Sequence, residues 1–223
     1  VTGSGTTQIT INPTNNLESS TEYYVQIDTT VFDDTFGNSY AGIVNAWTQI
    51  GNDIDGEYNN DHSGNSVSLS ADGSVVAIGA DRNDGTSTDA GHVRIYENNN
   101  GTWTQIGSDI DGEAANDYSG WSVSLSDDGS VVAIGAYAND GGGTDSGHVR
   151  IYENNNGTWT QIGSDIDGES SGDYFGWSVS LSSDGSVVAI GGIYDDDAAS
   201  DAGHVRIYEN NNGTWTQIGS DID

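Results

Sequence analysis

Short apolar runs separated by glycine, aspartate and asparagine recur along most of the chain. Each run holds four to seven residues and either alternates with small polar residues or is rich in β-branched ones. Val67 and Leu69 alternate with serines, whereas residues 75–78 form a nearly continuous apolar stretch. These lengths and periods predict β-strands rather than helices. We expect the alternating strand to bury one face and the continuous strand to be covered on both faces.

The residues between the runs predict how the strands are joined. The Asp-Gly pair at 72–73 favours a tight hairpin turn, because glycine accepts the positive φ angle that such turns need. A third strand is predicted at 93–95, with Arg94 facing outward, and the Asn-Gly pair at 100–101 turns the chain into a fourth strand at 103–106. Each stretch of roughly 50 residues therefore predicts an antiparallel sheet of four strands.

This order of strands and turns is repeated. The string WTQIG recurs at a constant spacing of 56 residues, opened by Trp47, Trp103, Trp159 and Trp215. The repeat divides the chain into units 47–102, 103–158 and 159–214, with the start of a fourth at 215–223. The units at 103–158 and 159–214 differ mainly in two loops, 114–120 and 136–146 and their equivalents. Such a period predicts the blades of a β-propeller-like array.

Three segments of each unit resemble FG-GAP repeats. In the third unit they are FGWSVS at 175–180, AIG at 189–191 and GHVRIY at 203–208. The resemblance covers residues 47–223 and implies blades like those of integrin-α-like propellers and microbial surface proteins. Two departures stand out: the family's Gly-Ala-Pro becomes Gly-Ala-Asp at 79–81, and its calcium loop between the first two strands is shortened to the Asp-Gly turn. The family's usual calcium site is therefore not expected.

The first 46 residues follow another pattern. Strands are predicted at Gln8–Ile11 and Tyr23–Ile27, and a turn around Asp34 and Gly37. The Tyr-Tyr-Val strand and the Phe-x-Asp-x-x-Gly-Asn turn resemble the C-terminal half of a bacterial Ig-like domain. We therefore expect an all-β chain: a partial Ig-like segment at 1–46, followed at 47–223 by tandem four-stranded antiparallel blades, open or completed by neighbours.

The charge restricts the partners. There are 35 acidic residues against four basic ones, all arginines, so the net charge is −31. Such a surface repels nucleic acid and anionic membranes, and no apolar stretch is long enough to insert into a bilayer. Solvation alone also explains an acidic surface. The absence of cysteine excludes disulfides and thiol chemistry. A start without Met indicates processing or a piece of a longer chain, and the whole composition predicts an extracellular or cell-surface protein.

The acidic string DIDGE, followed by a later aspartate, is the candidate metal site. Carboxylates beside a glycine offer several of the six to eight oxygens that calcium prefers. The same residues also fit a turn in which Asp side chains bond local backbone amides, which needs no metal. The candidate calcium ligands are Asp53, Asp55, Glu57, Asp61, Asp109, Asp111, Glu113, Asp117, Asp165, Asp167, Glu169 and Asp173.

Three further repeated features carry candidate chemistry. The Asn-Gly-Thr sequons offer N-glycosylation at Asn100, Asn156 and Asn212, although Asn-Gly is also what a hairpin turn prefers. His92, His148 and His204 favour a repeated structural hydrogen bond. The repeated tryptophans either pack between blades or stack on sugar rings. No nucleophile elbow, phosphate loop or metal-binding His pair is present, so we expect no enzyme and no required cofactor. Calcium and N-linked glycans are the possible additions.

Three complete blades and a spare strand are fewer than the four to eight that close a propeller. Exposed strand edges invite pairing with another chain. We therefore predict a structural subunit that binds itself head to tail in a filament or surface layer, with Gln8–Ile11 as a possible donated strand. The alternative is an adhesive or ligand-binding propeller domain of a larger cell-surface protein, with a carbohydrate or another cell-surface ligand.

Overall fold

The computed structural model describes residues 48–196 and 199–223, and Ile50–Asp223 form one compact unit. The described residues contain strands and turns but no helix, and hence none that could span a membrane. The strands predicted at Gln8–Ile11 and Tyr23–Ile27, including the proposed strand donor, lie outside the described residues.

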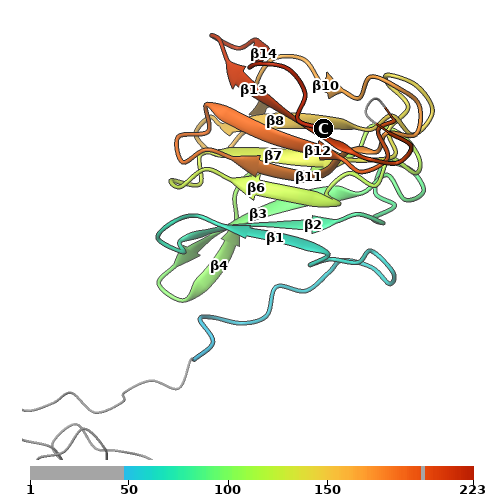
Figure 1. The fold of residues 1–223 in the computed structure, drawn as a ribbon. Helices are drawn as coiled ribbons and strands as arrows, with labels where there is room; N and C mark the ends of the chain where they lie inside the picture. Colours follow the sequence, from blue (N-terminus) through green and yellow to red (C-terminus); the bar gives the residue numbers. More distant parts are fainter. Residues whose placement is uncertain (1–47, 197–198) are drawn as a thin grey trace, which may run out of the picture. The chain divides into compact units, whose positions relative to one another are not determined.

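Three antiparallel sheets follow one another along the chain (Figure 1). The first holds β1 (Ser66–Leu69), β2 (Val75–Ala80), β3 (His92–Asn99), β4 (Thr102–Gln105) and β5 (Ile110–Asp111). The second holds β6 (Ser122–Leu125), β7 (Val131–Ala136), β8 (His148–Asn154), β9 (Trp159–Gln161) and β10 (Ile166–Asp167). The third holds β11 (Phe175–Leu181), β12 (Val187–Gly192), β13 (His204–Asn210) and β14 (Trp215–Gln217). The predicted all-β class with propeller-like blades is confirmed.

The outer strand of each blade comes from the WTQIG string of the next sequence unit. β4 and β5 pair one after the other with the same edge of β3, and Ile106 N donates to Ile95 O at 2.7 Å between them. Residues 215–217 close the third sheet in the same way. The spare strand predicted at 47–50 does not form at residues 48–50, which lie outside the strands of the described part of the chain, and Trp47 is not among the described residues.

The turn predicted at 72–73 is wider than a two-residue hairpin. Residues 70–74 connect β1 to β2, and Gly73 has the expected positive φ of 71°. The Oδ1 atom of Asp72 accepts hydrogen bonds from Ser74 N at 2.9 Å, Ser74 Oγ at 2.7 Å and Ser70 Oγ at 2.8 Å. These bonds, those from Ser74 first, lower the pKa of Asp72 to about 2. The connection between β1 and β2 is therefore held by the hydrogen bonds to the Asp72 carboxylate rather than by a two-residue turn.

The hydrophobic core lies between successive sheets. The face of the first sheet that carries Ala77, Val93 and Ile95 packs on the face of the second that carries Leu125, Val132 and Ile134. We call these the trailing face and the leading face of a blade. The trailing face of the second sheet packs in turn on Val188 and Ile190 of the third. Each blade is therefore stabilised by burying its apolar surface against its neighbours.

The same hydrogen bonds cross both junctions between blades. Leu125 N donates to Ser68 Oγ at 2.9 Å, and Leu181 N to Ser124 Oγ at 3.0 Å. Trp159 Nε1 donates to Ile106 O at 2.9 Å, as Trp103 and Trp215 do to the carbonyls 53 residues before them. Trp159 and Trp215 therefore lie between blades, one of the two roles that the sequence left open.

The two ends of the array leave one face each uncovered. Val67 and Leu69 on the leading face of the first sheet are 64% and 60% exposed, whereas the equivalent Leu125 is 7% exposed. The expectation that β1 buries one face is wrong for this blade, because no described sheet precedes it. On the trailing face of the third sheet, Val205 is 36% exposed, while its equivalents Val93 and Val149 are buried.

Candidate functional site

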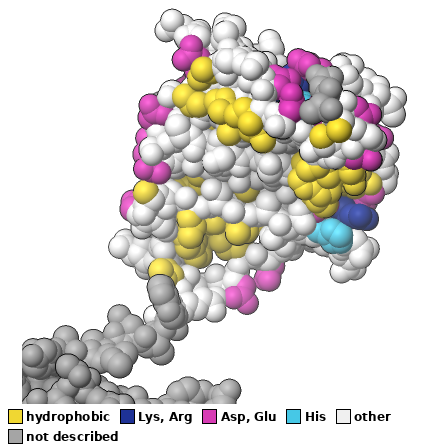
Figure 2. Space-filling view, viewed as in Figure 1, with side chains coloured by type: hydrophobic (Ala, Val, Ile, Leu, Met, Phe, Trp, Pro, Cys, Tyr) yellow, Lys and Arg dark blue, Asp and Glu magenta, His cyan; other side chains and the backbone are white. Residues whose placement is uncertain are grey.

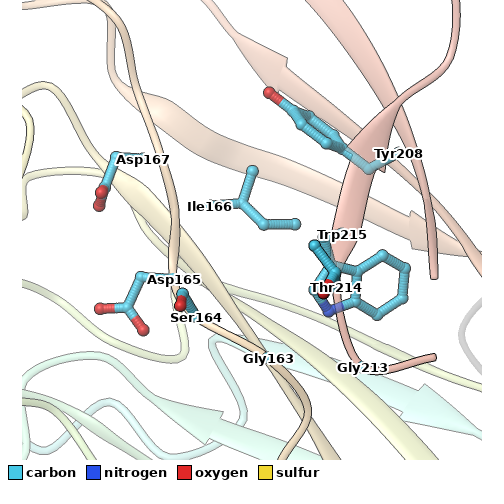
Figure 3. A pocket seen from close by; sticks show the side chains of 9 residues that line it. All are labelled: Gly163, Ser164, Asp165, Ile166, Asp167, Tyr208, Gly213, Thr214 and Trp215. Carbon is cyan, nitrogen blue, oxygen red and sulfur yellow. The ribbon is translucent and has the colours of Figure 1, made fainter. Parts of the chain in front are cut away.

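A small cleft opens beside each outer-strand tryptophan. The three clefts have volumes of about 300–340 Å³. In the cleft of the third sheet, Tyr208 and Trp215 form one wall and Ile166 points between them (Figure 3). The carboxylates of Asp165 and Asp167 lie on the opposite side of this strand segment (Figure 3). The acids of the DIDGE string are therefore presented away from the aromatic wall.

These acids meet the repeated histidines instead. His92 Nδ1 lies 3.6 Å from Asp109 Oδ2, and His148 Nδ1 lies 3.8 Å from Asp165 Oδ2. Adding Glu57 to the first pair and Glu113 to the second gives two groups whose potential ligand atoms all lie within 4.8 Å of one another. Both histidines are buried, and burial lowers the pKa of His92 and that of His148, the latter to about 4. Both imidazoles are therefore neutral near pH 7.

An arginine borders each group. Arg94, predicted to face outward, is only 6% exposed. Its Nη2 donates to Asp55 O at 2.7 Å, its Nη1 lies 3.8 Å from Glu57 Oε1, and its guanidinium carbon lies 5.7 Å from the ring centroid of Tyr96. Arg150 repeats this arrangement with Asp111, Glu113 and Tyr152. Both arginines are therefore buried and lie beside acidic residues.

The third repeat is built differently. His204 Nδ1 lies 2.8 Å from Asp195 Oδ2, and Arg206 Nη1 donates to Glu169 Oε1 at 2.9 Å. Asp195 stands at the position that asparagine occupies in the other two repeats, Asn83 and Asn139. The third histidine therefore lies beside a different acidic residue from the first two.

The four predicted calcium ligands of one unit do not form one group. Asp61, Asp117 and Asp173 are buried and bond their own loops. Asp117 Oδ2 accepts from Ala114 N at 3.0 Å and from Asn139 Nδ2 at 2.9 Å, and Asp61 repeats this with Tyr58 N and Asn83. The side chains of the other acids between them are exposed: Asp53, Asp55, Asp111 and Asp167. Calcium binding by these residues stays a prediction.

The sequon asparagines occupy exposed outer turns. Asn100, Asn156 and Asn212 follow the third strand of each blade, and each has a φ of 53°. This left-handed conformation before a glycine is the one that hairpin turns use. N-linked glycans at these three positions stay a prediction.

Sequence analysis missed a row of aromatic side chains on the second and third blades. Tyr118 stacks on Tyr137 with centroids 5.4 Å apart, and Trp121 lies 4.7 Å from Trp177. Further ring contacts join all six members: Tyr118, Trp121, Tyr137, Tyr174, Trp177 and Tyr194. We call them the aromatic row.

The aromatic row is accessible from outside. All six rings are partly or fully exposed, Tyr194 to 45%. Arg82 lies over the ring of Tyr118, 5.6 Å from its centroid, and Figure 2 shows a hydrophobic patch beside an exposed basic side chain and a histidine. Four of the six belong to the two loops in which the units differ. The first unit has His62 and Asn65 where the other two have tyrosine and tryptophan, and this difference was the signal in the sequence for the surface.

Comparison with protein families agrees with the repeat geometry. The FG-GAP repeat model matches residues 109–152 and 165–208, each from β5 or β10 to the third strand of the next blade. The chain carries FG-GAP repeats. A bacterial Ig-like domain model matches residues 1–48, in agreement with the resemblance of the first 46 residues. Both kinds of domain are typical of extracellular or cell-surface proteins.

Solved structures with a similar fold are distant. They include a putative 6-phosphogluconolactonase from Bacteroides uniformis (16% identity, TM-score 0.47, covering 70% of this chain and 39% of that one). Another is hydrazine synthase from Kuenenia stuttgartiensis, with 10% identity and a TM-score of 0.44, covering 74% of this chain and 38% of that one. A third is Sqt1 from Saccharomyces cerevisiae, with 12% identity and a TM-score of 0.46, covering 72% of this chain and 36% of that one. The chain thus spans well under half the length of each. No curated protein sequence matches it.

Proposed function

We propose that the protein is an extracellular structural subunit that assembles head to tail through the two uncovered faces of its blade array. The observation that carries the proposal is that two different faces are exposed. The first sheet exposes Val67 and Leu69 of its leading face, and the third sheet exposes its trailing face. FG-GAP repeats, typical of cell-surface and adhesion proteins, support the extracellular setting.

The two uncovered faces are complementary, because each is one half of an interface that the chain already forms twice. At the internal junction, Ser124 Oγ of a trailing face accepts a hydrogen bond from Leu181 N of a leading face. Ser180 is the equivalent of Ser124 and is exposed, and Leu69 is the equivalent of Leu181. A second copy can therefore place its Leu69 on Ser180 with the geometry of an internal junction.

This arrangement replaces the pairing of strand edges expected from the sequence with packing of sheet faces. The two faces are different surfaces of one molecule, so their contact is heterologous. Heterologous contacts give a closed ring if the rotation between copies closes, and a filament if it does not. The energy would come mainly from apolar burial, and the net charge of −31 opposes association at low salt.

Leu69→Glu is expected to abolish this assembly without unfolding the subunit. A carboxylate on the leading face would be buried unpaired at the junction, whereas in the free subunit it stays in water. Light scattering and negative-stain electron microscopy at ~0.15 M salt should show multiples of 23.3 kDa for the wild type and single subunits for the variant.

Tyr58→Glu is the matched control, because Tyr58 is 75% exposed and belongs to no strand of the two faces. It adds the same charge and should assemble like the wild type. A wild-type chain that stays monomeric at all concentrations and salt conditions contradicts the proposal, as does a Leu69→Glu variant that assembles normally.

The aromatic row favours a second function, the adhesive or ligand-binding one. Tyrosine and tryptophan offer large rigid surfaces with a polar edge, which suits stacking on the apolar faces of sugar rings. Neutral oligosaccharides are the ligand class that this row fits, since the acidic surface repels anionic glycans.

Tyr194→Ala is expected to weaken oligosaccharide binding by roughly fivefold, since an aromatic stacking contact is worth about 0.5–1.5 kcal/mol beyond its area burial. Tryptophan fluorescence titrations with neutral hexose oligomers would measure the loss. Tyr58→Ala, an equally exposed tyrosine outside the row, should bind like the wild type. Equal affinities for the wild type and Tyr194→Ala would contradict this function.

A further inference from the structure

We propose that the chain binds a divalent transition-metal ion of the zinc class at two equivalent sites, one at the first blade and one at the second. The first site consists of Glu57, His92 and Asp109, and the second of Glu113, His148 and Asp165. The sites share no residue with the aromatic row. His92 pairs with Ala80 and so lies on the leading face of the first sheet, but at 1% exposure it is already covered within the subunit.

The distances suit ligands that share one ion. His92 Nδ1 and Asp109 Oδ2 are 3.6 Å apart, and the equivalent atoms of His148 and Asp165 are 3.8 Å apart. Both separations are too long for a hydrogen bond. Two ligands held about 2.0–2.2 Å from a tetrahedral ion are themselves roughly 3.4 Å apart, so a small adjustment seats the ion.

His92 supplies the second observation. The residue is only 1% exposed, and its Nε2 has no hydrogen-bond partner in the described part of the chain. Its Nδ1 is directed at the carboxylate of Asp109 without bonding it. Buried imidazoles normally have partners on their nitrogens, since a lost hydrogen bond costs free energy. An ion between Nδ1 and the two carboxylates would bind the nitrogen that faces Asp109, whereas Nε2 lies outside the site.

The ligand set selects the class of ion. One imidazole nitrogen and two carboxylates resemble the three-ligand zinc sites that leave a position for water. Calcium would need more oxygens than these residues provide. Glu57 and Asp109 are 39% and 30% exposed at their side chains, so water can reach the open position.

The neighbouring arginine is compatible with a bound cation. Arg94 Nη1 approaches Glu57 Oε1 at 3.8 Å, which leaves the other carboxylate oxygen for the ion. Two carboxylates and one guanidinium leave a net negative charge at the site. The guanidinium also donates to Asp55 O, which fixes the backbone beside Glu57.

The third repeat is an internal negative control. His204 Nδ1 is 2.8 Å from Asp195, and Glu169 is bonded to Arg206, so neither points at a shared position. No corresponding group occurs among the described residues of that repeat. Two ions per chain, rather than three, are therefore expected.

Native mass spectrometry and calorimetry would test the sites. The chain is stripped with a chelator and titrated with zinc chloride in excess magnesium, which occupies exposed carboxylates. The wild type should bind two zinc ions per chain, His92→Gln one, and the His92→Gln/His148→Gln double variant none at matched concentration. His204→Gln should still bind two.

Asp109→Asn/Asp165→Asn keeps the test valid if a histidine variant fails to fold, because both aspartates are partly exposed. It should weaken zinc binding roughly 100-fold, while its circular dichroism stays that of the wild type. Three results would overturn the proposal: no zinc retained over magnesium by the wild type, unchanged stoichiometry in the folded double variants, or equal loss on His204→Gln.

Discussion

Gly135→Ala is expected to lower the free energy of unfolding by about 3 kcal/mol, because a methyl group there collides with the next blade. A Cβ atom on Gly135 would lie well inside van der Waals contact of the Gly176 carbonyl oxygen. That carbonyl also accepts a hydrogen bond from Ser122 Oγ at 2.8 Å, so it cannot move away without a further loss. Urea denaturation followed by circular dichroism would measure the change.

Gly191→Ala is the matched control at the same position of the third blade. The nearest atom to its Cβ would be Ser178 Oγ at 2.6 Å, which can rotate, and the next is His204 O at 3.9 Å. With both variants made in the monomeric Leu69→Glu background, no further blade covers this face among the described residues, so the cost should stay below about 1 kcal/mol. Equal losses for the two variants would show that the collision with the following blade is not the cause.

The strands and the blades could be predicted from the sequence because their signals are local. Alternating apolar residues, Gly-containing turns and a 56-residue period each depend on neighbours in the chain. The width of the Asp72 turn could not be predicted in this way. It depends on two serines that compete with the backbone for the same carboxylate.

Which residues meet across the repeats was harder to predict, because it depends on how one blade stacks on the next. The candidate metal site was assigned within a unit, whereas the structure brings Glu57 and His92 together with Asp109 of the following unit. Arg94 was expected outside because its strand alternates, but the Asp55 carbonyl of the preceding loop covers it. Burial between repeats is not visible in a periodic pattern.

Near-identical repeats also conceal what is different at the ends. Val67 and Leu69 have the same sequence context as Val123 and Leu125, yet only the second pair is covered. The aromatic row shows the opposite case, since it lies where the units diverge. In a repeat protein, residues that are identical in every unit indicate packing between blades. Loops that differ between units are the better indication of a binding surface.

Asp117→Ala is expected to lower the free energy of unfolding by about 3 kcal/mol, with or without calcium. Its carboxylate is 3% exposed and accepts hydrogen bonds from Ala114 N and Asn139 Nδ2. Truncation leaves two donors without a partner, and each buried unsatisfied group costs about 1–3 kcal/mol. Denaturation in urea, once with calcium and once with a chelator, would measure the loss.

Asp127→Ala removes one exposed acid from the same blade and should change stability by no more than about 0.5 kcal/mol. The comparison separates the bonds of Asp117 from the relief of charge repulsion in a chain of net charge −31. If Asp117 served as a calcium ligand instead, calcium would stabilise the wild type, and the difference between wild type and variant would shrink in the chelator. Because the hydrogen bonds of Asp117 lie within the protein, we expect wild type and variant to differ in free energy of unfolding by the same amount in both buffers. That result would show that this carboxylate stabilises the fold rather than binding calcium.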